Sequence, residues 1–386
     1  MDSKQLKIAT QNMVGTLVKN KEIIINIVTL FICILLIISM ILFLGLRKVQ
    51  LTNQCKSMNK TYKELAKIQP MGLTDTHFTA PLAEYYIKGS FNSCCPGNYS
   101  NAWVDLCALT NVIKQGCRVL DFQIYNIDNK PVVAASSDTN NYSKGTWNYL
   151  DFAEVIQLIG TNAFSPSTCP NYSDPLFLNF RLQTTNTLAM NTMAQILRDE
   201  TTLSGKYLGS NYSYESRGKN LGNKPLSMFR NKVTIFLTES SGSFRETDLW
   251  EWVNMCGQTP VLTSYNFSKI IYSNDVTSLI NNNKKKLCIC YPDQSGKAEN
   301  YSSAGCQYYG VQICLMNYQT KDSYLDSYNS FFENQKEGSY AFVRKPLNLR
   351  FKSIPVNQAP SVPPNQYLGS RTNTAGAPGS EITFTL

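Results

Sequence analysis

Residues 85–137 contain three short apolar runs, each followed by small or polar residues: Tyr85-Tyr-Ile-Lys-Gly-Ser-Phe-Asn-Ser93, Gly116-Cys-Arg-Val-Leu-Asp-Phe-Gln123 and Lys130-Pro-Val-Val-Ala-Ala-Ser-Ser137. This layout favours parallel strands whose carboxyl ends open into one pocket. The chain has a single histidine, His77, which lies outside all three runs. The ends of these strands therefore lack the side chain that most often carries protons near neutral pH.

Apolar runs and helix-like stretches continue to alternate through residues 81–350. The expected strands are 85–88, 119–125, 132–135, 176–182, 233–237, 269–272, 287–291 and 311–317. The expected helices are 102–115, 150–160, 188–199, 248–255, 276–282 and 323–332. Because the runs are apolar throughout, they favour strands that are covered on both faces. About eight strands with intervening helices predict an α/β fold, a (β/α)8 barrel of the TIM type.

The composition divides the chain into seven expected parts. They are a polar tail (1–22), a transmembrane anchor (23–46), a stalk (47–80), two half barrels (81–204 and 225–350), a linker (205–224) and an extended or disordered tail (351–386). The linker is rich in Gly, Asn and Ser, and the C-terminal tail in Pro, Gly, Ser, Asn and Thr. Such segments contain too few apolar side chains to fold alone.

Residues 23–46 are 24 residues without a charge, rich in Ile and Leu. At about 1.5 Å per residue, a helix of this length spans about 36 Å. That length crosses a hydrocarbon core of about 30 Å, whereas the core of a signal peptide is roughly half as long. We therefore predict an uncleaved single-pass anchor rather than a buried core helix.

The orientation of this anchor rests on two opposing signals. Lysines and arginines flank both ends of the anchor, so the positive-inside rule gives no decision or leans against an external C-terminal domain. Eleven of the twelve cysteines follow the anchor, there is no Cys-x-x-Cys pair, and one histidine cannot build a mixed zinc site. Disulfides in an oxidising compartment are the preferred interpretation, with reduced core cysteines as the alternative. We therefore expect an extracytoplasmic or lumenal globular domain (type II).

The net charge of +9 is spread over scattered lysines and arginines, with one run at Lys284-Lys285-Lys286. Scattered charge does not favour a nucleic-acid groove, so nucleic acid is not an expected partner. Anionic lipid and other proteins are the expected partners, in addition to the membrane. The run itself is best interpreted as a solvated loop.

The motifs resemble, in order and spacing, the catalytic barrel of eukaryotic-type phosphoinositide-specific phospholipase C. Residues 85–93 resemble the family's YFISSSHNTY, 116–123 resemble GCRCVELD, 131–135 resemble PVIYH and 175–181 resemble PVILSLE. Further matches follow at 291–292, 300–307, 315–320 and 338–346. The resemblance covers residues 82–350, so that 81–204 is the X-like half and 225–350 the Y-like half. No lipid-binding, EF-hand or C2 module is evident in the sequence.

The resemblance implies a phosphodiesterase in which two histidines transfer protons and one Ca²⁺ polarises the phosphate. In this chain the two histidine positions hold Phe91 and Ala135, and the calcium-ligand positions hold Asn92, Asp121, Gln123 and Arg181. The family's three carboxylates thus become one carboxylate, one amide and one guanidinium, so the formal charge changes from −3 to 0. We expect no catalytic residues and no Ca²⁺ or other cofactor, with Asn92 and Asp121 as residual ligands. Arg181 is predicted to pair with Asp121 in the place of the metal.

The remaining candidates have plainer interpretations. His77 is a loop residue; Asp138, Glu239 and Glu246 are surface acids; and Trp250 and Trp252 pack within a predicted helix. Cys94-Cys95 has no histidine to activate it as a nucleophile, so a disulfide or core packing is preferred.

The sequence thus predicts a membrane-anchored, catalytically inactive phospholipase C-like protein that serves as a structural or interaction module. Two alternatives stay open: a phosphoric diester hydrolase acting on inositol lipids with a rebuilt site, and a lipid- or phosphate-binding receptor. The bias toward Ile, Asn, Lys and Tyr predicts an AT-rich genome, such as that of a protist or a large DNA virus. A virion-membrane or capsid-associated location is the extension of that prediction.

Overall fold

Two compact units make up the chain, Met1–Arg350 and Phe351–Leu386. The computed structural model describes residues 3–72, 75–137, 142–209, 212, 220–238, 242–293, 295–336, 338–352, 372–375, 379 and 382–385. Asp138, Glu239 and much of the predicted linker at 205–224 lie outside the described residues.

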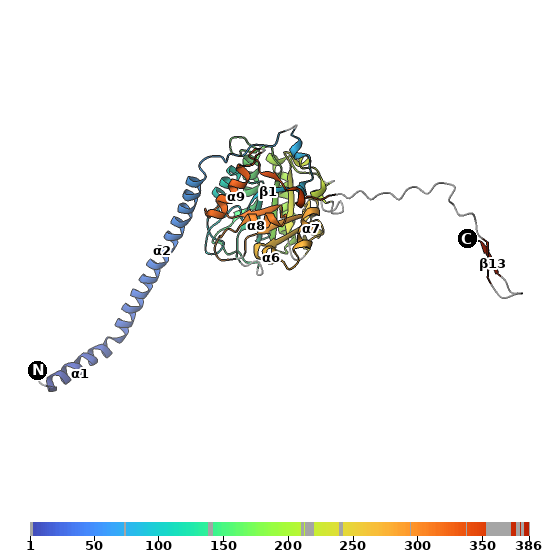
Figure 1. Cartoon of the computed structure of the whole chain (residues 1–386). Helices are drawn as coiled ribbons and strands as arrows, with labels where there is room; N and C mark the ends of the chain where they lie inside the picture. The colour runs from blue at the N-terminus through green and yellow to red at the C-terminus, as the bar shows by residue number, and fades with distance from the viewer. Residues whose placement is uncertain are drawn as a thin grey trace. The chain divides into compact units, whose positions relative to one another are not determined.

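Eight parallel strands form a nearly closed barrel in the first unit (Figure 1). They are β1 (Tyr85–Ser90), β2 (Val119–Ile127), β5 (Leu176–Gln183), β6 (Val233–Thr238), β7 (Met255–Cys256), β8 (Leu262–Asn266), β9 (Leu287–Tyr291) and β10 (Ile313–Met316). Their order is β7-β6-β5-β2-β1-β10-β9-β8, and within the described residues the gap in pairing falls between β7 and β8. The strands are buried along most of their length, which explains their uniformly apolar sequence. The predicted barrel is confirmed.

Helices connect the strands and cover the outside of the barrel. They are α3 (Leu106–Lys114), α4 (Phe152–Asn162), α5 (Thr187–Asp199), α6 (Phe267–Ile271), α7 (Val276–Lys285), α8 (Ser303–Tyr308) and α9 (Ser323–Glu333). Several begin at an Asp or Asn whose side chain accepts a backbone N–H of the first turn, as Asp105 does for α3 and Asn186 for α5. Between β6 and β7 the described chain forms only the short 3-10 helices η8 (Ser243–Glu246) and η9 (Asp248–Glu251).

The strand predicted at 132–135 is not a barrel strand. It is β3 (Lys130–Ala134), which folds back antiparallel on β2 and pairs on its other edge with β4 (Leu150–Asp151). The turn between β2 and β3 is Asp128-Asn129, and both residues have a positive φ (50° and 63°). Two adjacent left-handed residues of this type make a tight hairpin turn that matches the twist of the strands.

Two other predicted elements were wrong in type. Residues 269–272 belong to helix α6 and the turn after it, and the strand of this region is β8. The predicted helix at 248–255 is the short helix η9 followed by β7. Apolar runs of four or five residues do not distinguish a short helix from a buried strand, because both periodicities fit them.

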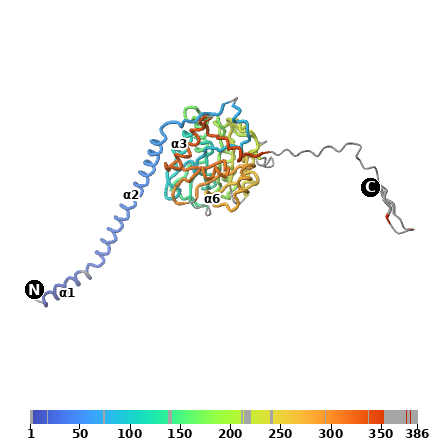
Figure 2. The backbone as a smooth tube through the Cα atoms, in the orientation of Figure 1, coloured from blue at the N-terminus to red at the C-terminus, as the bar shows by residue number. Residues whose placement is uncertain are grey.

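The N-terminal part consists of two helices, α1 (Ser3–Lys19) and α2 (Lys21–Thr61). Helix α2 is long and apolar enough to span a membrane, and its apolar side chains between residues 23 and 46 are exposed. Its C-terminal turns lie against α3, and Figure 2 follows the backbone from α2 into the barrel. The predicted stalk at 47–80 is therefore helical up to residue 61, where α2 ends.

One disulfide joins Cys55 of α2 to Cys107 of α3, 52 residues apart. The other ten cysteines are free thiols; nine are buried and Cys33 of α2 is exposed. The predicted disulfide chemistry is thus confirmed for one pair, and the alternative of reduced core cysteines describes most of the others.

The second unit contains an antiparallel pair of strands, β12 (Thr372–Ala375) and β13 (Ile382–Thr385). The sequence predicted only an extended or disordered tail at 351–386. Most of that tail lies outside the described residues.

Candidate functional site

Asp121, on β2, is the centre of a buried polar cluster. Its Oδ1 accepts hydrogen bonds from Arg181 Nε (2.9 Å) and Asn179 Nδ2 (2.7 Å). Its Oδ2 accepts from a terminal guanidinium nitrogen of Arg181 (2.7 Å) and from the backbone N–H of Asn92 (3.0 Å). Both carboxylate oxygens therefore have their hydrogen-bonding capacity largely used within the protein.

The parallel pairing of β2 with β5 creates this arrangement. Asp121 lies opposite Asn179, and Gln123 lies opposite Arg181. Because residues two apart on a strand face the same side, Arg181 is the diagonal neighbour of Asp121 and its long side chain reaches the carboxylate. Asn92, just beyond β1, has a φ of 41°, a left-handed conformation that asparagine tolerates well.

The Arg181 guanidinium also contacts residues other than Asp121. A terminal guanidinium nitrogen also donates to Asn92 Oδ1 (2.6 Å), and the guanidinium carbon lies 4.4 Å from the centroid of the Phe91 ring. Burial alone would lower the pKa of Arg181, but attraction to the Asp121 carboxylate outweighs it and the pKa is raised. A buried, bidentate pair of this kind is costly to break from one side, by about 3–5 kcal/mol. The pair predicted from the sequence is therefore present, with Asn92 as a third member.

The two positions that the resemblance assigned to histidines hold side chains that cannot transfer protons. Phe91 packs between Tyr99 and Tyr291, with ring centroids 5.6 Å and 5.8 Å away. Ala135 is fully buried just beyond β3, and its carbonyl accepts the backbone N–H groups of residues 145 and 146. Aromatic packing therefore occupies the first of these two positions, and a hydrogen-bonded backbone turn occupies the second.

Gln123 does not join the Asp121 cluster. Its Nε2 donates to the carbonyl of Ser136 (3.1 Å), and its Oε1 accepts from the Ser136 backbone N–H (2.7 Å) and from the Tyr125 hydroxyl (2.8 Å). The amide therefore braces the β2–β3 hairpin. An amide both donates and accepts, so it suits this role better than the carboxylate that the family pattern has here.

Asn179 and Tyr291 belong to the cluster, although the sequence did not single them out. The Asn179 Nδ2 donates both to Asp121 and to the Tyr291 hydroxyl (3.0 Å). Burial raises the pKa of Tyr291, so its hydroxyl is neutral at ordinary pH. The available signal was an amide in the otherwise apolar run Leu176-Phe-Leu-Asn-Phe180, since a buried polar residue requires a partner.

The family implies a bound Ca²⁺, but the residues present do not fit one. Ca²⁺ takes six to eight oxygen ligands, with several carboxylates among them. Asp121 offers one carboxylate, both of its oxygens bind Arg181, and the Asn92 Oδ1 binds the same guanidinium. The cation at the centre of the potential ligands is therefore Arg181. The described groups that are spaced for a metal are Cys55, Asp105 and Cys107, and two of these form the disulfide.

The other sequence candidates lie apart from the cluster or are inert. His77 is half exposed and its Nδ1 lies 2.8 Å from Asp75 Oδ1. Cys95 is close to the cluster, but burial raises the pKa of its thiol to about 12, and that of Cys94 is raised as well. Thiols of this kind are poor nucleophiles. Glu246 is exposed on η8.

Lys284 and Lys285 end helix α7, and Lys286 follows it. Trp250 lies on η9 and Trp252 just after it; each packs against another aromatic ring, Phe244 and Tyr207 respectively. None of these residues contributes to the Asp121 cluster among its described contacts.

Comparisons with known proteins identify the family of this barrel. Residues 78–235 match the family model of the phosphatidylinositol-specific phospholipase C X domain, and residues 234–348 match that of the Y domain. The match to the X domain includes the linker predicted at 205–224, so it ends later than the X-like half predicted at 81–204. No curated protein sequence matches the chain.

Among solved structures, the fold is similar to the crystal structures of S. officinalis PLC21 and L. pealei PLC21. Each superposes with a TM-score of 0.56, at 16% and 17% sequence identity respectively. The matches cover 72% of this chain but only 38% and 39% of those chains. The chain therefore spans less than two fifths of the length of either protein, and at this identity the likeness is one of fold.

Proposed function

Because the chain belongs to the phosphatidylinositol-specific phospholipase C family, we propose that it is a membrane-anchored member without phosphodiesterase activity. In this proposal the barrel acts as a structural or interaction module. The observation that carries the proposal is the bidentate pair of Arg181 with Asp121, which also engages Asn92. A guanidinium stands where the family places a cation surrounded by carboxylates.

The lack of proton-transferring side chains at the two histidine positions supports the same proposal. General acid–base catalysis by a positioned side chain contributes about 10²–10⁴-fold to a reaction rate, and the family chemistry uses two such groups. Phe91 and Ala135 supply neither. The one histidine, His77, precedes β1, whereas Asn92 follows the last residue of β1 and donates its backbone N–H to Asp121. His77 is therefore at the wrong end of the barrel to replace them.

The contacts of the cluster disfavour both alternatives. A rebuilt hydrolase requires Asp121 to bind a metal, and a phosphate receptor requires Arg181 to bind the ligand. In this structure each of these side chains is the principal partner of the other, and Arg181 is buried. Either alternative would have to break a buried ion pair before binding its ligand.

The test is hydrolysis by the full-length protein in mixed micelles that contain phosphatidylinositol or phosphatidylinositol bisphosphate, with Ca²⁺ present. We expect no release of soluble inositol phosphates above the rate without protein, while an active family member assayed in parallel gives robust turnover. Turnover by this chain that disappears in Asp121→Asn would refute the proposal and establish the rebuilt hydrolase. Turnover that is equal in wild type and Asp121→Asn indicates a contaminating activity.

The expected partners in this role are other proteins and anionic lipid, in keeping with the net charge of +9. The viral or protist origin and the virion-membrane location remain predictions from composition.

A further inference from the structure

Helix α1 is exposed along the whole of its described length. It has 17 residues, and every side chain of it that the structure describes is exposed to solvent. A lone helix of this length is marginal in water, because most helical stability in proteins comes from packing of an apolar face. A surface outside the chain is therefore needed to cover α1. The nature of that surface depends on α2, the membrane anchor of the proposed function, on which this inference rests.

One face of α1 is apolar. Ala9, Met13 and Val14 follow Leu6 at spacings of three, seven and eight residues, which places all four on one stripe of the helix. Leu6 and Met13 are 58% and 70% exposed, so the stripe is uncovered in the chain itself. The opposite face is polar except for Ile8, and its polar members are Lys4, Gln5, Gln11, Asn12 and Lys19. A helix with this pattern suits the boundary between an apolar phase and water.

The charge of α1 is all of one sign. Residues 3–19 contain Lys4, Lys7 and Lys19 and no acidic residue. Each lysine close to an anionic lipid surface favours binding to it by about fivefold. The same charges disfavour pairing of α1 with the α1 of a second copy, because like charges repel. Charge complementarity therefore favours anionic lipid over a second copy of the chain.

The position of α1 in the chain brings its end to the membrane surface. Helix α1 ends at Lys19 and α2 begins at Lys21, with only Asn20 between them. The backbone at Asn20 (φ −104°, ψ 14°) departs from helical values, so α1 and α2 are separate helices. The uncharged stretch of α2 starts at Ile23, about one helical turn beyond Lys19. When α2 spans a bilayer, α1 therefore ends at the level of the lipid headgroups.

We propose that α1 lies in the membrane interface and binds anionic lipid, with its apolar stripe toward the acyl chains and its lysines toward the headgroups. Leu6 and Met13 then lie about 5–10 Å into the boundary between headgroups and acyl chains, which is the usual depth of an interfacial helix. Lys4 and Lys19 stay on the aqueous side. Lys7 lies at the border of the stripe, and its long side chain reaches up to the phosphates. The chain thus contacts the bilayer through a surface helix as well as through a span.

The test uses the full-length protein with Cys33→Ser, in lipid nanodiscs, with one added cysteine that carries a nitroxide label. The added cysteines replace neighbours on opposite faces of α1, in the pairs Gln5→Cys with Leu6→Cys and Asn12→Cys with Met13→Cys. The free thiols other than Cys33 are buried, and protein without an added cysteine measures any background labelling. Electron paramagnetic resonance with oxygen, which enters lipid, and with a water-soluble nickel chelate then gives the depth of each label.

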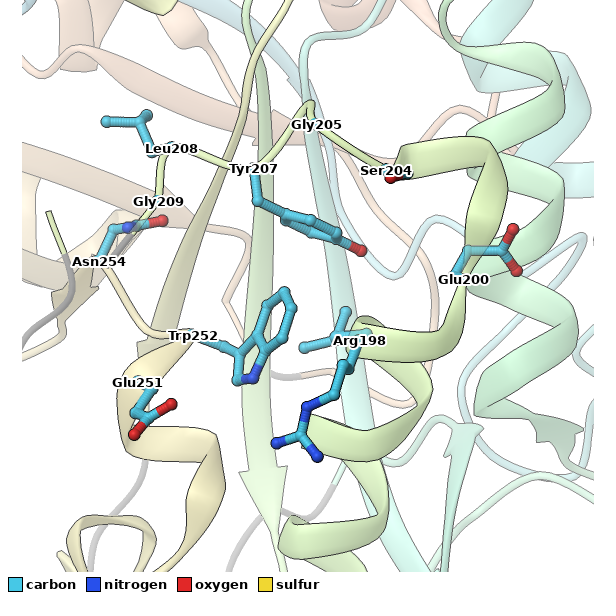
Figure 3. A pocket seen from close by; sticks show the side chains of 11 residues that line it. Arg198, Glu200, Ser204, Gly205, Tyr207, Leu208, Gly209, Glu251, Trp252 and Asn254 are labelled. Atoms are coloured by element: carbon cyan, nitrogen blue, oxygen red, sulfur yellow. The ribbon is translucent and has the colours of Figure 1, made fainter. Parts of the chain in front are cut away.

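Two further positions calibrate the depth scale. Leu35→Cys, within the uncharged stretch of α2, is the lipid reference. Glu251→Cys is the water reference, because Glu251 is exposed on the barrel, beside Trp252 at the cavity shown in Figure 3. In discs with about 30% phosphatidylserine, the labels of Leu6→Cys and Met13→Cys should lie about 5–10 Å into the lipid. The labels at positions 5 and 12 should resemble the water reference.

The role of the lysines is tested with Met13→Cys as the reporter. The triple variant Lys4→Gln, Lys7→Gln and Lys19→Gln removes the charge and keeps the helix propensity, which is similar for Lys and Gln. In discs with phosphatidylserine, accessibility of the reporter to the nickel chelate should increase about fivefold or more. The matched control changes the three lysines 284–286, at the end of α7 on the barrel, to Gln and should leave the reporter unchanged.

Four results would overturn the proposal. Labels of Leu6→Cys and Met13→Cys that are as accessible to nickel as that of Glu251→Cys would place α1 in water. Equal depths for neighbouring positions would show that α1 has no preferred face, and an unchanged reporter in the α1 triple variant would exclude anionic lipid. Broadening of the Met13→Cys spectrum that disappears on dilution with unlabelled protein would show that α1 pairs with a second copy.

The Leu35→Cys label separates this inference from the proposed function. If this label lies in lipid while the α1 labels lie in water, only the inference about α1 fails. If the Leu35→Cys label itself lies in water, the membrane anchor of the proposed function is refuted together with the surface helix.

Discussion

Lys345 is a buried cation whose protonation couples to folding. Its Nζ donates to the Asn283 carbonyl (3.0 Å), and burial lowers the pKa of Lys345 to about 7, against smaller opposing effects of Cys288 and Glu84. The unfolded chain keeps this proton up to its ordinary pKa of 10.5, whereas the folded chain releases it above about 7. Because the unfolded state binds more protons in this window, the contribution of Lys345 to stability increases with pH.

We therefore expect the melting temperature of wild type to rise from pH 7 to pH 8.5 relative to that of Lys345→Met. The difference in stability over this range is about 1–2 kcal/mol. Differential scanning calorimetry of both proteins measures it, with the exposed Lys321→Met as control. The range stops at pH 8.5 because burial raises the pKa of Cys95, Cys117 and Cys288 from 9.0 to about 12, so their contribution to stability is lost as pH rises beyond 9. Identical pH profiles for wild type and Lys345→Met would contradict the assignment.

At single positions, the sequence was most informative where this chain has a residue of opposite charge to the one in the family pattern. Arg181 in place of a carboxylate predicted the pair with Asp121, because a buried guanidinium requires an anion. Gln123 was grouped with that cluster, yet its amide bonds to the β2–β3 hairpin. Nothing in a linear sequence shows in which of two directions a buried amide points. Asn179 was missed for the related reason that its partner Tyr291 is 112 residues away.

Among the elements, helix α2 differs most from expectation, because its last turns are part of the folded domain. Arg47, Leu51, Cys55 and Met58 are each partly or fully buried. Their spacing of three or four residues places them on one helix face, toward the folded domain. A stripe of this kind is hard to recognise directly after an anchor whose residues are apolar on every face.

The Cys55–Cys107 disulfide fixes this end of α2, so its removal has a predictable effect. A cross-link that closes about 50 residues stabilises by about 3–4 kcal/mol in the chain-entropy model. We expect Cys55→Ser to lower the melting temperature by about 3–8 °C and to open a protease site near residues 56–66. Calorimetry and limited proteolysis of the full-length protein measure both effects, and Cys33→Ser, which changes a free exposed thiol, is the control. If Cys55→Ser melts and cleaves like Cys33→Ser, then α2 is held by packing alone.

The barrel strands were predictable where the apolar run was long, and less so where it was short. Predicted strands of four to seven residues coincide with β1, β2, β5, β6, β9 and β10 in their observed places, and all but the first of these were five residues or longer. The hairpin strand β3 was assigned to the barrel because the positive-φ turn at Asp128-Asn129 was not recognised as a two-residue reversal. The two-residue strand β7 carries no sequence signal of its own, since its position is fixed by pairing with β6.

At the scale of the whole molecule, the anchor and the barrel are close in space as well as in sequence. The first charged residue after the apolar segment, Arg47, stacks on Trp147, with 3.2 Å between its guanidinium carbon and the ring centroid. Trp147 follows Gly145 and Thr146, whose backbone N–H groups bond to the carbonyl of Ala135. If α2 spans a bilayer, the end of the barrel that holds the Asp121 cluster is the end nearest the lipid surface.

Two features bear on which side of the membrane the barrel lies: the basic residues that flank the anchor, and the disulfide that follows it. Basic residues on both flanks of residues 23–46 give no clear orientation. The Cys55–Cys107 disulfide begins shortly after the anchor and requires an oxidising compartment to persist. Because a disulfide is incompatible with a reducing cytosol, we predict type II topology, with residues 1–22 in the cytoplasm.

Protease treatment of intact microsomes that contain the full chain tests this topology. The barrel should be protected while a tag at the N-terminus is digested, and the barrel should become sensitive once detergent is added. Asn98 begins an Asn-Tyr-Ser sequon and is exposed, so a lumenal barrel should also carry a glycan that Asn98→Gln removes. Asn171 is the matched negative control, because it begins a sequon but is fully buried once folded. A barrel digested in intact microsomes, without a glycan and with Cys55 and Cys107 open to thiol alkylation, would place the domain in the cytoplasm and contradict the prediction.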